Sequence, residues 1–358
     1  MRTFRVELGP DAHPVHVGPG ALDQTGRLAR EAGLAAGRAL IVTDSNVARL
    51  YGERAAAALE AAGFAPRTLE VAAGERSKSL ATLERVYDAI VEAELDRGGA
   101  VFALGGGVVG DLAGFAAATY MRGVALVQIP TTMVAQVDSA LGGKTAVNHP
   151  RAKNLIGAFY QPRLVVADVA TLASLPAREF REGLAEVIKY GAIMDAPMVE
   201  ALERGLDAIE RRELVALEEI VTRSLHHKAT VVANDTREGG LRKILNYGHT
   251  VGHALEASSG YGNLLHGEAV AMGMVAAGKL SQAFAGLEAT EAQRLERLIA
   301  QAGLPTAMPA RWRGEEFVRA IRLDKKRDGD GVEFVLLDRL GHALVRKLTF
   351  AQILAHLG

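Results

Sequence analysis

Two histidines four residues apart, with a third close behind, are the residues best suited to chemistry in this sequence. His249 and His253 would project from one face of a helix, one turn apart. Such a pair can bind one metal ion or one anion, although hydrogen-bonded histidines of an ordinary packed helix can have the same spacing. His266 adds a third imidazole, and Arg242 and Asn246 fall on the same predicted helix face. So many polar groups on one stripe favour a functional site.

A carboxylate elsewhere in the chain is suited to complete a metal site. The sequence has no cysteine, so histidine and carboxylate are the strong metal ligands that remain. Thr250 stands where a zinc metalloprotease has glutamate, which argues against that class. Glu186 and Lys189 lie three apart on another predicted helix, a spacing typical of an exposed ion pair. With three histidines and no cysteine elsewhere in the chain, Glu186 is instead a candidate for a His/His/Glu site that leaves positions open for substrate oxygens.

A glycine-rich run follows the strand predicted at 100–104. It contains Gly105, Gly106, Gly107 and Gly110, and a helix of small residues follows. Glycines permit positive φ and close approach of the backbone, while the amides at the start of the helix can bind a pyrophosphate. The pattern therefore predicts dinucleotide binding, with a tight strand–helix turn as the alternative.

Other polar residues stand where a ligand would be bound. Asp44 ends a strand and is suited to a ribose, with Asn46 beside it, or else it only caps the next helix. Lys144 follows a Gly-Gly turn, and Lys153-Asn154 precedes an apolar run. These contexts favour cations that bind phosphate or carboxylate over solvated surface lysines.

The predicted elements divide the chain into two parts. A strand pair within 3–17 and strands at 39–44, 67–71, 100–104, 125–129 and 164–168 alternate with helices, which indicates a mostly parallel sheet covered on both faces. Beyond Pro176 the pattern is helical, except for a hairpin within 332–346. Helices are predicted at 177–194, 197–211, 213–234, 242–258, 266–284, 289–302 and 315–324. We predict an α/β domain at 1–175 and a mainly α-helical domain at 176–358.

The composition is that of an ordinary globular protein. Of the 358 residues, 49% are apolar, and 41 Lys+Arg against 42 Asp+Glu leave a net charge of −1. No bulk charge therefore favours nucleic acid or an anionic membrane as a partner. No apolar run reaches the length of a membrane span or a signal core, so we expect a cytoplasmic protein.

Eight motifs, in order over nearly the whole chain, resemble 3-dehydroquinate synthase, a family of sugar-phosphate cyclases. The resemblance implies an N-terminal Rossmann-like domain, a C-terminal helical domain, NAD, a divalent metal (zinc or cobalt), a small sugar phosphate as substrate, and a homodimer. Each motif alone is weak, but the set is specific. The motifs occupy 105–111, 120–123, 130–132, 137–145, 153–159, 185–189, 245–253 and 265–268.

The resemblance also assigns individual residues. The implied metal ligands are Glu186, His249 and His266. His253, which spacing alone nominates as a ligand, instead corresponds to a residue near the substrate phosphate. The implied NAD contacts are Asp44, Asn46, Glu75, Lys78, Gly106, Gly107, Asp111, Thr131, Thr132, Lys144, Lys153 and Thr171. The implied catalytic and substrate-binding residues are Arg122, Asp138, Lys144, Asn154, Lys189, Lys228, Arg242, Asn246 and His253, with one of Lys325 and Lys326.

The implied reaction belongs to the shikimate pathway of aromatic amino acid biosynthesis and is that of a phosphate-eliminating lyase. The substrate is 3-deoxy-D-arabino-heptulosonate 7-phosphate, and the steps are transient oxidation by NAD, phosphate elimination, re-reduction and aldol closure to 3-dehydroquinate. The alternatives are another sugar-phosphate cyclase, a metal-dependent polyol dehydrogenase of similar two-domain build, and a binding protein that kept the fold without turnover.

Overall fold

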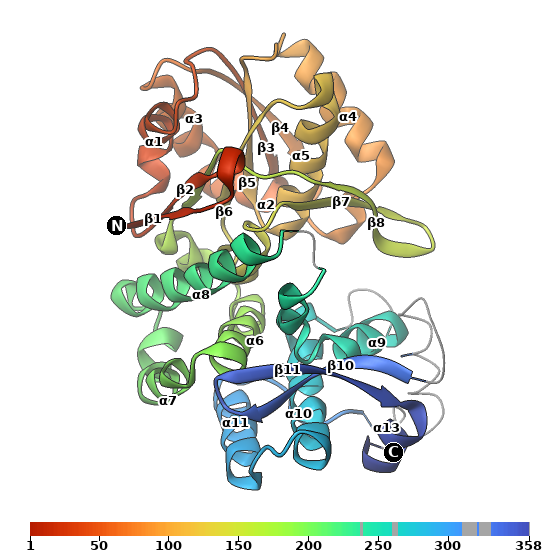
Figure 1. Cartoon of the computed structure of the whole chain (residues 1–358). Coiled ribbons are helices and arrows are strands. Elements are labelled where there is room, and N and C mark those ends of the chain that lie inside the picture. Colours follow the sequence, from red (N-terminus) through yellow and green to blue (C-terminus); the bar gives the residue numbers. More distant parts are fainter. Residues whose placement is uncertain (237–238, 260–263, 310–320, 322–330, 358) are drawn as a thin grey trace. The chain divides into compact units, whose positions relative to one another are not determined.

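The computed structural model describes residues 1–236, 239–259, 264–309, 321 and 331–357 (Figure 1). Apart from Ile321, the helix predicted at 315–324 lies outside the described residues, and so do Lys325 and Lys326. The chain forms two compact units. Unit 1 comprises Met1–Leu175 and Leu214–Arg237, and unit 2 comprises Pro176–Glu213 and Glu238–Gly358.

Unit 1 is built on a seven-stranded sheet in the order β1-β2-β9-β6-β5-β3-β4. Only β1 and β2 pair antiparallel, and every other neighbouring pair is parallel. This confirms the predicted mostly parallel sheet. The strands are β1 (Arg2–Val6), β2 (His13–Val17), β3 (Arg38–Asp44), β4 (Ala65–Val71), β5 (Ala100–Gly105), β6 (Ala125–Pro130) and β9 (Leu164–Ala167).

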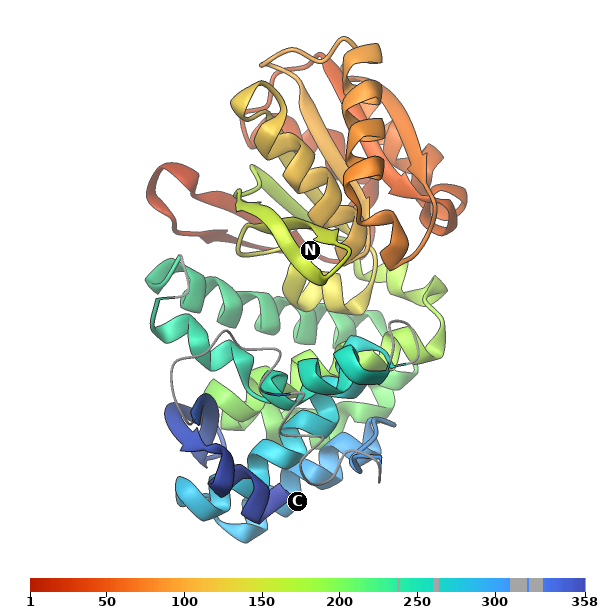
Figure 2. The ribbon, with the colours of Figure 1, turned by 90° about the vertical axis from the view of Figure 1, so that its right-hand side faces the viewer.

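Helices cover both faces of this sheet because alternate side chains of each buried strand point to opposite sides. Ile41 and Phe102 pack in one core with α1 (Thr25–Glu31) and α3 (Glu53–Glu60). Their neighbours Leu40 and Val101 pack in a second core with α4 (Leu80–Glu92) and α5 (Gly107–Thr119). Figure 2 shows α4 and α5 side by side along the sheet. The two cores explain why β3 and β5 are almost entirely apolar.

Two further strands, β7 (Lys144–His149) and β8 (Ala152–Phe159), form an antiparallel hairpin that packs on α5. The sequence analysis predicted no strand here. A Cβ at Gly157 would lie 2.2 Å from the carbonyl oxygen of Thr145, so glycine allows the two strands to approach. Shorter segments join the larger elements of unit 1: η1 (Gly9–Asp11), η2 (Leu22–Gln24), α2 (Ser45–Val47), η3 (Ala48–Gly52), η4 (Glu75–Ser77), η5 (Tyr120–Arg122), η6 (Ala135–Ser139) and η7 (Val169–Ser174).

The helix α8 (Leu214–Asn234) corrects the predicted division of the chain. It was assigned to a second domain at 176–358, but it packs on β1, β2, η6 and η7 and belongs to unit 1 (Figure 1). The terminal amine of Met1 pairs with Glu218 at 3.2 Å, and the rings of Phe4 and His226 lie 5.6 Å apart. A helical periodicity predicts the helix itself, whereas its partner is decided by these long-range contacts.

Unit 2 is organised around α10 (His266–Phe284), which contacts α6, α9, α11, β10 and α13. Small residues such as Ala269, Gly273 and Ala277 are buried along it and let neighbouring helices approach closely. The predicted hairpin is confirmed as β10 (Gly331–Arg339) with β11 (His342–Thr349). The other helices in the described part of unit 2 are α6 (Ala177–Met194), α7 (Ala196–Glu210), η8 (Leu241–Asn246), α9 (His249–Ser259), α11 (Ala289–Gln301) and α13 (Phe350–Leu357).

The helix predicted at 242–258 is not continuous. It consists of η8 and α9, separated at Tyr247-Gly248, where Gly248 has φ +80°. A Cβ at Gly248 would lie 2.7 Å from Cγ of Met274 and 2.8 Å from the carbonyl oxygen of Val270. Close packing on α10 therefore fixes the break. Arg242 and Asn246 are on η8 and do not share a helix face with His249 and His253, so that part of the spacing argument was wrong.

Candidate functional site

Glu186, His249 and His266 lie together in unit 2. One potential ligand atom from each residue falls within 4.8 Å of the others. Nε2 of His249 and Nε2 of His266 lie 3.6 Å and 3.5 Å from Oε1 of Glu186. The three residues come from α6, α9 and α10, so the packing of these helices assembles the cluster.

Glu186 is 1% exposed, and neither of its carboxylate oxygens accepts a hydrogen bond within the described parts of the chain. Its charge is balanced by an ion pair with Lys189, which is also 1% exposed. Lys189 pairs with Oε2, whereas Oε1 faces both histidines and accepts no hydrogen bond from a described residue, so a further cation can bind there. One carboxylate and two imidazoles are a common donor set of catalytic zinc sites, so these residues fit a divalent metal.

The ionisable groups of the cluster shift one another's pKa. Burial alone would raise the pKa of Glu186, but the positive charge of Lys189 and contacts with His249 and His266 hold that pKa well below its usual value. Burial, and then the charge of Lys189, lowers the pKa of His249. Burial would also lower the pKa of His266, but the neighbouring carboxylates of Glu186 and Glu256 raise it to about 10. The cluster thus holds an ionised carboxylate and, at His249, a neutral imidazole, while His266 has to give up one proton when a metal ion binds.

The first turns of α9 and α10 carry the two histidines. Nδ1 of His249 donates to the carbonyl oxygen of Tyr247 at 3.1 Å. Next to His266, the amide of Gly267 donates to Oε2 of Glu182 at 3.2 Å, and Glu268 accepts from the amide of Leu265 at 2.9 Å. These hydrogen bonds therefore fix the backbone at the positions from which the two imidazole side chains project.

His253 lies beside the cluster. Its ring centroid is 5.3 Å from that of His249 and 6.1 Å from that of His266. His253 and His266 also form a second possible metal-binding group with Glu256, a residue that the sequence analysis did not nominate. Its place on α9 supplies a signal that could have found it, since positions 249, 253 and 256 share one helix face. Arg242, 2% exposed, and Asn246 lie on η8 of the same unit.

In unit 1, several of the predicted NAD contacts stand at the carboxyl ends of parallel strands, where α/β sheets bind nucleotides. Asp44 ends β3, Gly106 follows β5, Thr131 follows β6, and Thr171 lies on η7 after β9. Asp44 also caps α2, because its carboxylate accepts from the amides of Asn46 and Val47 at 2.9 and 3.1 Å. The helix-cap interpretation of Asp44 therefore holds, and its contact with a ribose stays a prediction.

The glycine run before α5 was expected to need positive φ, but at Gly106 glycine is required for another reason. Gly106 is the N-cap of α5 with φ −78°, so this residue does not need positive φ. Close packing requires it to be glycine instead: a Cβ would lie 2.9 Å from Cγ2 of Thr132. At Gly107 a Cβ would lie 3.1 Å from Oγ of Ser139. The glycine run brings the backbone close to Thr132, and the N-cap residue Gly106 makes no side-chain hydrogen bond to the amides at the start of α5.

Lys78 binds two other predicted residues, Asp111 and Asn154. Its ammonium group pairs with Asp111 and donates to Oδ1 of Asn154, while its side chain is almost fully buried. Asn148, which the sequence analysis did not nominate, donates to Glu75 at 2.7 Å and accepts from the amide of Asn154 at 2.8 Å. No sequence signal singled out Asn148, because its role arises where the β7–β8 hairpin meets η4.

The other predicted residues of unit 1 have varied settings. Lys228 of α8 pairs with the carboxylate of Asp138 at 2.9 Å and donates to its carbonyl oxygen at 2.7 Å. Arg122 and Asn154 are two of the five described non-glycine residues with positive φ, at 67° and 55°. Such backbone conformations are costly and are often found at functional sites. Lys144 and Lys153 lie on the two strands of the β7–β8 hairpin.

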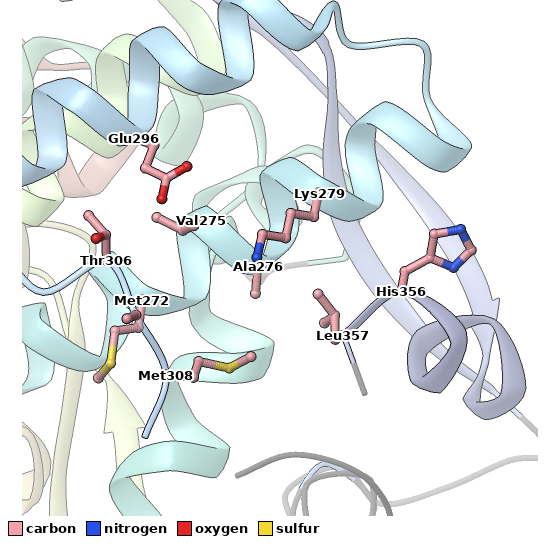
Figure 3. Close-up of a pocket in the computed structure, with 10 residues that line it drawn as sticks. Met272, Val275, Ala276, Lys279, Glu296, Thr306, Met308, His356 and Leu357 are labelled. Atoms are coloured by element: carbon pink, nitrogen blue, oxygen red, sulfur yellow. The ribbon is translucent and has the colours of Figure 1, made fainter. Parts of the chain in front are cut away.

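Unit 2 also has a separate hollow of about 330 Å³. It is lined by residues of α10, α11 and α13 and by residues 306–308, and its polar side chains are Lys279, Glu296, Thr306 and His356 (Figure 3). None of the residues that the sequence analysis assigned to metal, NAD or substrate lines this hollow. In the described parts of the chain, no helix is both long and apolar enough to cross a bilayer.

The fold of the chain is that of dehydroquinate synthase-like sugar-phosphate cyclases. It superimposes on a crystal structure of 2-deoxy-scyllo-inosose synthase complexed with carbaglucose-6-phosphate, NAD+ and Co2+, with a TM-score of 0.89 and 26% identity over 99% of this chain and 98% of the other. With 2-epi-5-epi-valiolone synthase from Streptomyces hygroscopicus subsp. jinggangensis, which has NAD+ and Zn2+ bound, the TM-score is 0.86 and the identity 31% over 96% and 95%.

More specifically, the chain belongs to the 3-dehydroquinate synthase family. The model of the N-terminal part of 3-dehydroquinate synthase matches residues 68–182, and that of the C-terminal part matches residues 183–327. A 3-dehydroquinate synthase from Citrifermentans bemidjiense is 48% identical over 346 residues, which are 97% of this chain and 95% of the relative. The predicted family is thereby confirmed.

Proposed function

We propose that this chain catalyses the reaction of its family, the conversion of 3-deoxy-D-arabino-heptulosonate 7-phosphate to 3-dehydroquinate and phosphate. NAD is oxidised and regenerated in each turnover, and one divalent metal ion, zinc or cobalt, is required. The observation that carries the proposal is the cluster of Glu186, His249 and His266 in a chain of this family. The proposal includes the homodimer and the cytoplasmic location predicted from the sequence.

The metal would be held by those three residues and, when bound, supplies Lewis acidity that favours loss of a proton from a substrate hydroxyl. The similar cyclases contain NAD+ with Co2+ or Zn2+, which supports both cofactors for this chain. Three protein ligands leave coordination positions open, as catalytic sites need. Lys189 pairs with Glu186 and keeps its carboxylate ionised, so that it remains an anionic ligand.

The substrate carries a carboxylate and a phosphate, and the proposed binding residues supply positive charge for both. In unit 2 the charged groups are Lys189 and Arg242, with His253 and Asn246 as hydrogen-bonding groups. Arg242 is 2% exposed, so its guanidinium acts in a desolvated setting where charge pairing is strong. The unit 1 residues proposed for the substrate are Arg122, Asp138, Lys144, Asn154 and Lys228, and those proposed for NAD are the twelve assigned by the family resemblance.

A phosphate-release assay tests the proposal. The purified chain is incubated with the heptulosonate phosphate in four conditions, with and without NAD+ and with and without a chelator. We expect phosphate only with NAD+ present and chelator absent, and recovery when Zn2+ or Co2+ is restored. Absorbance of the reduced nicotinamide should stay flat, since NAD is regenerated. Stoichiometric accumulation of NADH would instead identify a polyol dehydrogenase.

A substrate panel separates the proposed activity from that of other cyclases. Sedoheptulose 7-phosphate resembles the proposed substrate but lacks its carboxylate. We expect the carboxylated substrate to be preferred, because Arg242 and the lysines would otherwise be left with an unpaired anion site. Preference for sedoheptulose 7-phosphate would contradict the proposed substrate, and binding of NAD without any turnover would favour a binding protein.

A further inference from the structure

Glu256 lies next to the proposed metal centre and is given no role by the proposed function. It lies on α9, seven residues after His249, and its side chain is 13% exposed. Its Oε2 accepts a hydrogen bond from Nδ1 of His266 at 3.1 Å. We propose that Glu256 is a positioning residue of the metal centre, which turns Nε2 of His266 toward the metal that Glu186 and His249 also bind. This inference rests on the metal site of the proposed function.

The two histidines of the centre are oriented in the same way. In each, Nε2 points toward Oε1 of Glu186, at 3.6 Å for His249 and 3.5 Å for His266. In each, Nδ1 is held by an oxygen at 3.1 Å, the carbonyl of Tyr247 for His249 and the carboxylate of Glu256 for His266. An ionised carboxylate is only an acceptor, so His266 would keep its proton on Nδ1 and give up the proton on Nε2 when a metal ion binds there.

The backbone hydrogen bonds around His266 do not orient its imidazole, whereas Glu256 does. Leu265 donates its amide to Glu268 at 2.9 Å, and Gly267 donates its amide to Glu182 at 3.2 Å. These bonds fix the Cα of His266 at the start of α10, but they do not fix the torsion angles of its side chain. The contact between Nδ1 and Glu256 restricts those angles. A carboxylate partner at Nδ1 also makes Nε2 a more basic metal ligand than a neutral carbonyl partner would.

A second possible metal-binding group has to be distinguished from the proposed one. Ligand atoms of His253, Glu256 and His266 also lie within 4.8 Å of one another, so Glu256 would be a direct ligand if a metal bound there. The first arrangement is favoured because Oε1 of Glu186 lies 3.6 and 3.5 Å from Nε2 of His249 and His266 and accepts no hydrogen bond among the described residues, whereas Glu256 already binds Nδ1 of His266.

The test measures metal binding in the full chain, without substrate. Glu256→Gln keeps an acceptor of the same shape but removes the charge, and Glu256→Leu removes both. Glu296→Gln, at an exposed position of α11, is the matched control. Affinity for Zn2+ is measured by competition with a chromophoric chelator, and the visible spectrum of the Co2+ form reports the number of ligands. Circular dichroism and NAD binding check that each variant is folded.

We expect Glu256→Gln to weaken metal binding about tenfold and Glu256→Leu by up to about 100-fold, with the control unchanged. The Co2+ spectrum at saturation should keep the intensity of the wild type, because the three ligands remain. Wild-type affinity in both variants would overturn the proposal. So would a Co2+ spectrum showing one ligand fewer, which would make Glu256 a ligand. If Glu256→Leu does not fold, Glu256→Gln decides alone. Metal-loaded wild type that releases no phosphate would count against the proposed function only.

Discussion

The polar groups of the two units differ in how completely the protein itself satisfies them. In unit 1, Lys78 pairs with Asp111 and Asn154, and Lys228 pairs with Asp138, so the predicted cofactor and substrate residues neutralise one another. In unit 2, the buried carboxylate of Glu186 pairs with Lys189 through Oε2, but Oε1 faces two imidazoles and accepts no hydrogen bond from any described residue. These polar groups of unit 1 are paired within the protein, whereas the centre of unit 2 keeps an oxygen and two imidazoles that fit a metal ion.

The largest expected effect tests the centre of unit 2. His266→Ala removes one of three proposed ligands and should abolish stoichiometric metal binding while the fold is retained. Loss of the Lewis acid should reduce phosphate release by about three orders of magnitude. Metal analysis and the phosphate assay check this. His342→Ala, at an exposed position of the β10–β11 turn, should change neither. Bound metal and near-normal turnover in His266→Ala would refute the assignment.

A smaller effect tests how the helices of unit 2 assemble the centre. A Cβ at Gly267 would lie 1.9 Å from the carbonyl oxygen of Glu182, a contact with backbone that no side-chain rotation relieves. Gly267→Ala should therefore lower the free energy of unfolding by about 3 kcal/mol and weaken metal binding.

Gly205→Ala is the matched control for that substitution. Gly205 lies within α7, and a Cβ there would meet nothing within 4 Å. Alanine should stabilise the helix by up to about 1 kcal/mol. Urea unfolding of both variants gives the comparison, and equal stability of the two would show that the approach of α6 and α10 is not as tight as described.

In unit 1, the network itself can be broken. Burial raises the pKa of Asp111, and Lys78 opposes that shift. Lys78→Met would leave the carboxylate buried without its partner and should cost about 2 kcal/mol of unfolding free energy at pH 7.5. In the double variant Lys78→Met/Asp111→Asn the buried charge is gone, so stability should largely return. A double variant no more stable than Lys78→Met would contradict a network held together by charge pairing.

The smallest effect concerns pH. Burial lowers the pKa of His13 on β2, whose side chain is almost fully buried. The unfolded chain then binds a proton more readily than the folded one, so stability is full above pH 6.5 and falls as pH drops below that value. The free energy of unfolding should fall between pH 7.5 and 5.5, and in His13→Gln this fall should be smaller by about 1 kcal/mol. Urea unfolding of both proteins at the two pH values measures it, and identical losses would rule out His13 as the cause.

Local patterns predicted the elements better than the site. Apolar strands and helical periodicity gave the parallel sheet and helices such as α10, because burial sets those patterns directly. The break at Gly248 was missed, since only its packing on Met274 and Val270 of α10 distinguishes it from a glycine inside a helix. The β7–β8 hairpin was missed as well, because its residues suggested ligand binding rather than a strand.

The site itself depended on contacts that no local pattern contains. Residue types and spacing nominated Glu186 and the three histidines, with His249 and His253 as the pair, whereas the choice of Glu186, His249 and His266 came from the resemblance to a family. The structure brings Glu186, His249 and His266 together from three helices, which is consistent with that set. Asn148 and Glu182 contribute hydrogen bonds between segments far apart in sequence, so neither could be recognised before the fold was known.

The path of the chain through α8 has a consequence for how the protein is made. Unit 1 contains residues 1–175 and then Leu214–Arg237, while α6 and α7 in between belong to unit 2. On the ribosome, the nascent sheet must therefore wait for about sixty further residues before the helix carrying Lys228 can dock on it. A fragment ending at Leu175 would expose the apolar surface of β1 and β2 that α8 covers, and it should aggregate rather than fold as an independent nucleotide-binding domain.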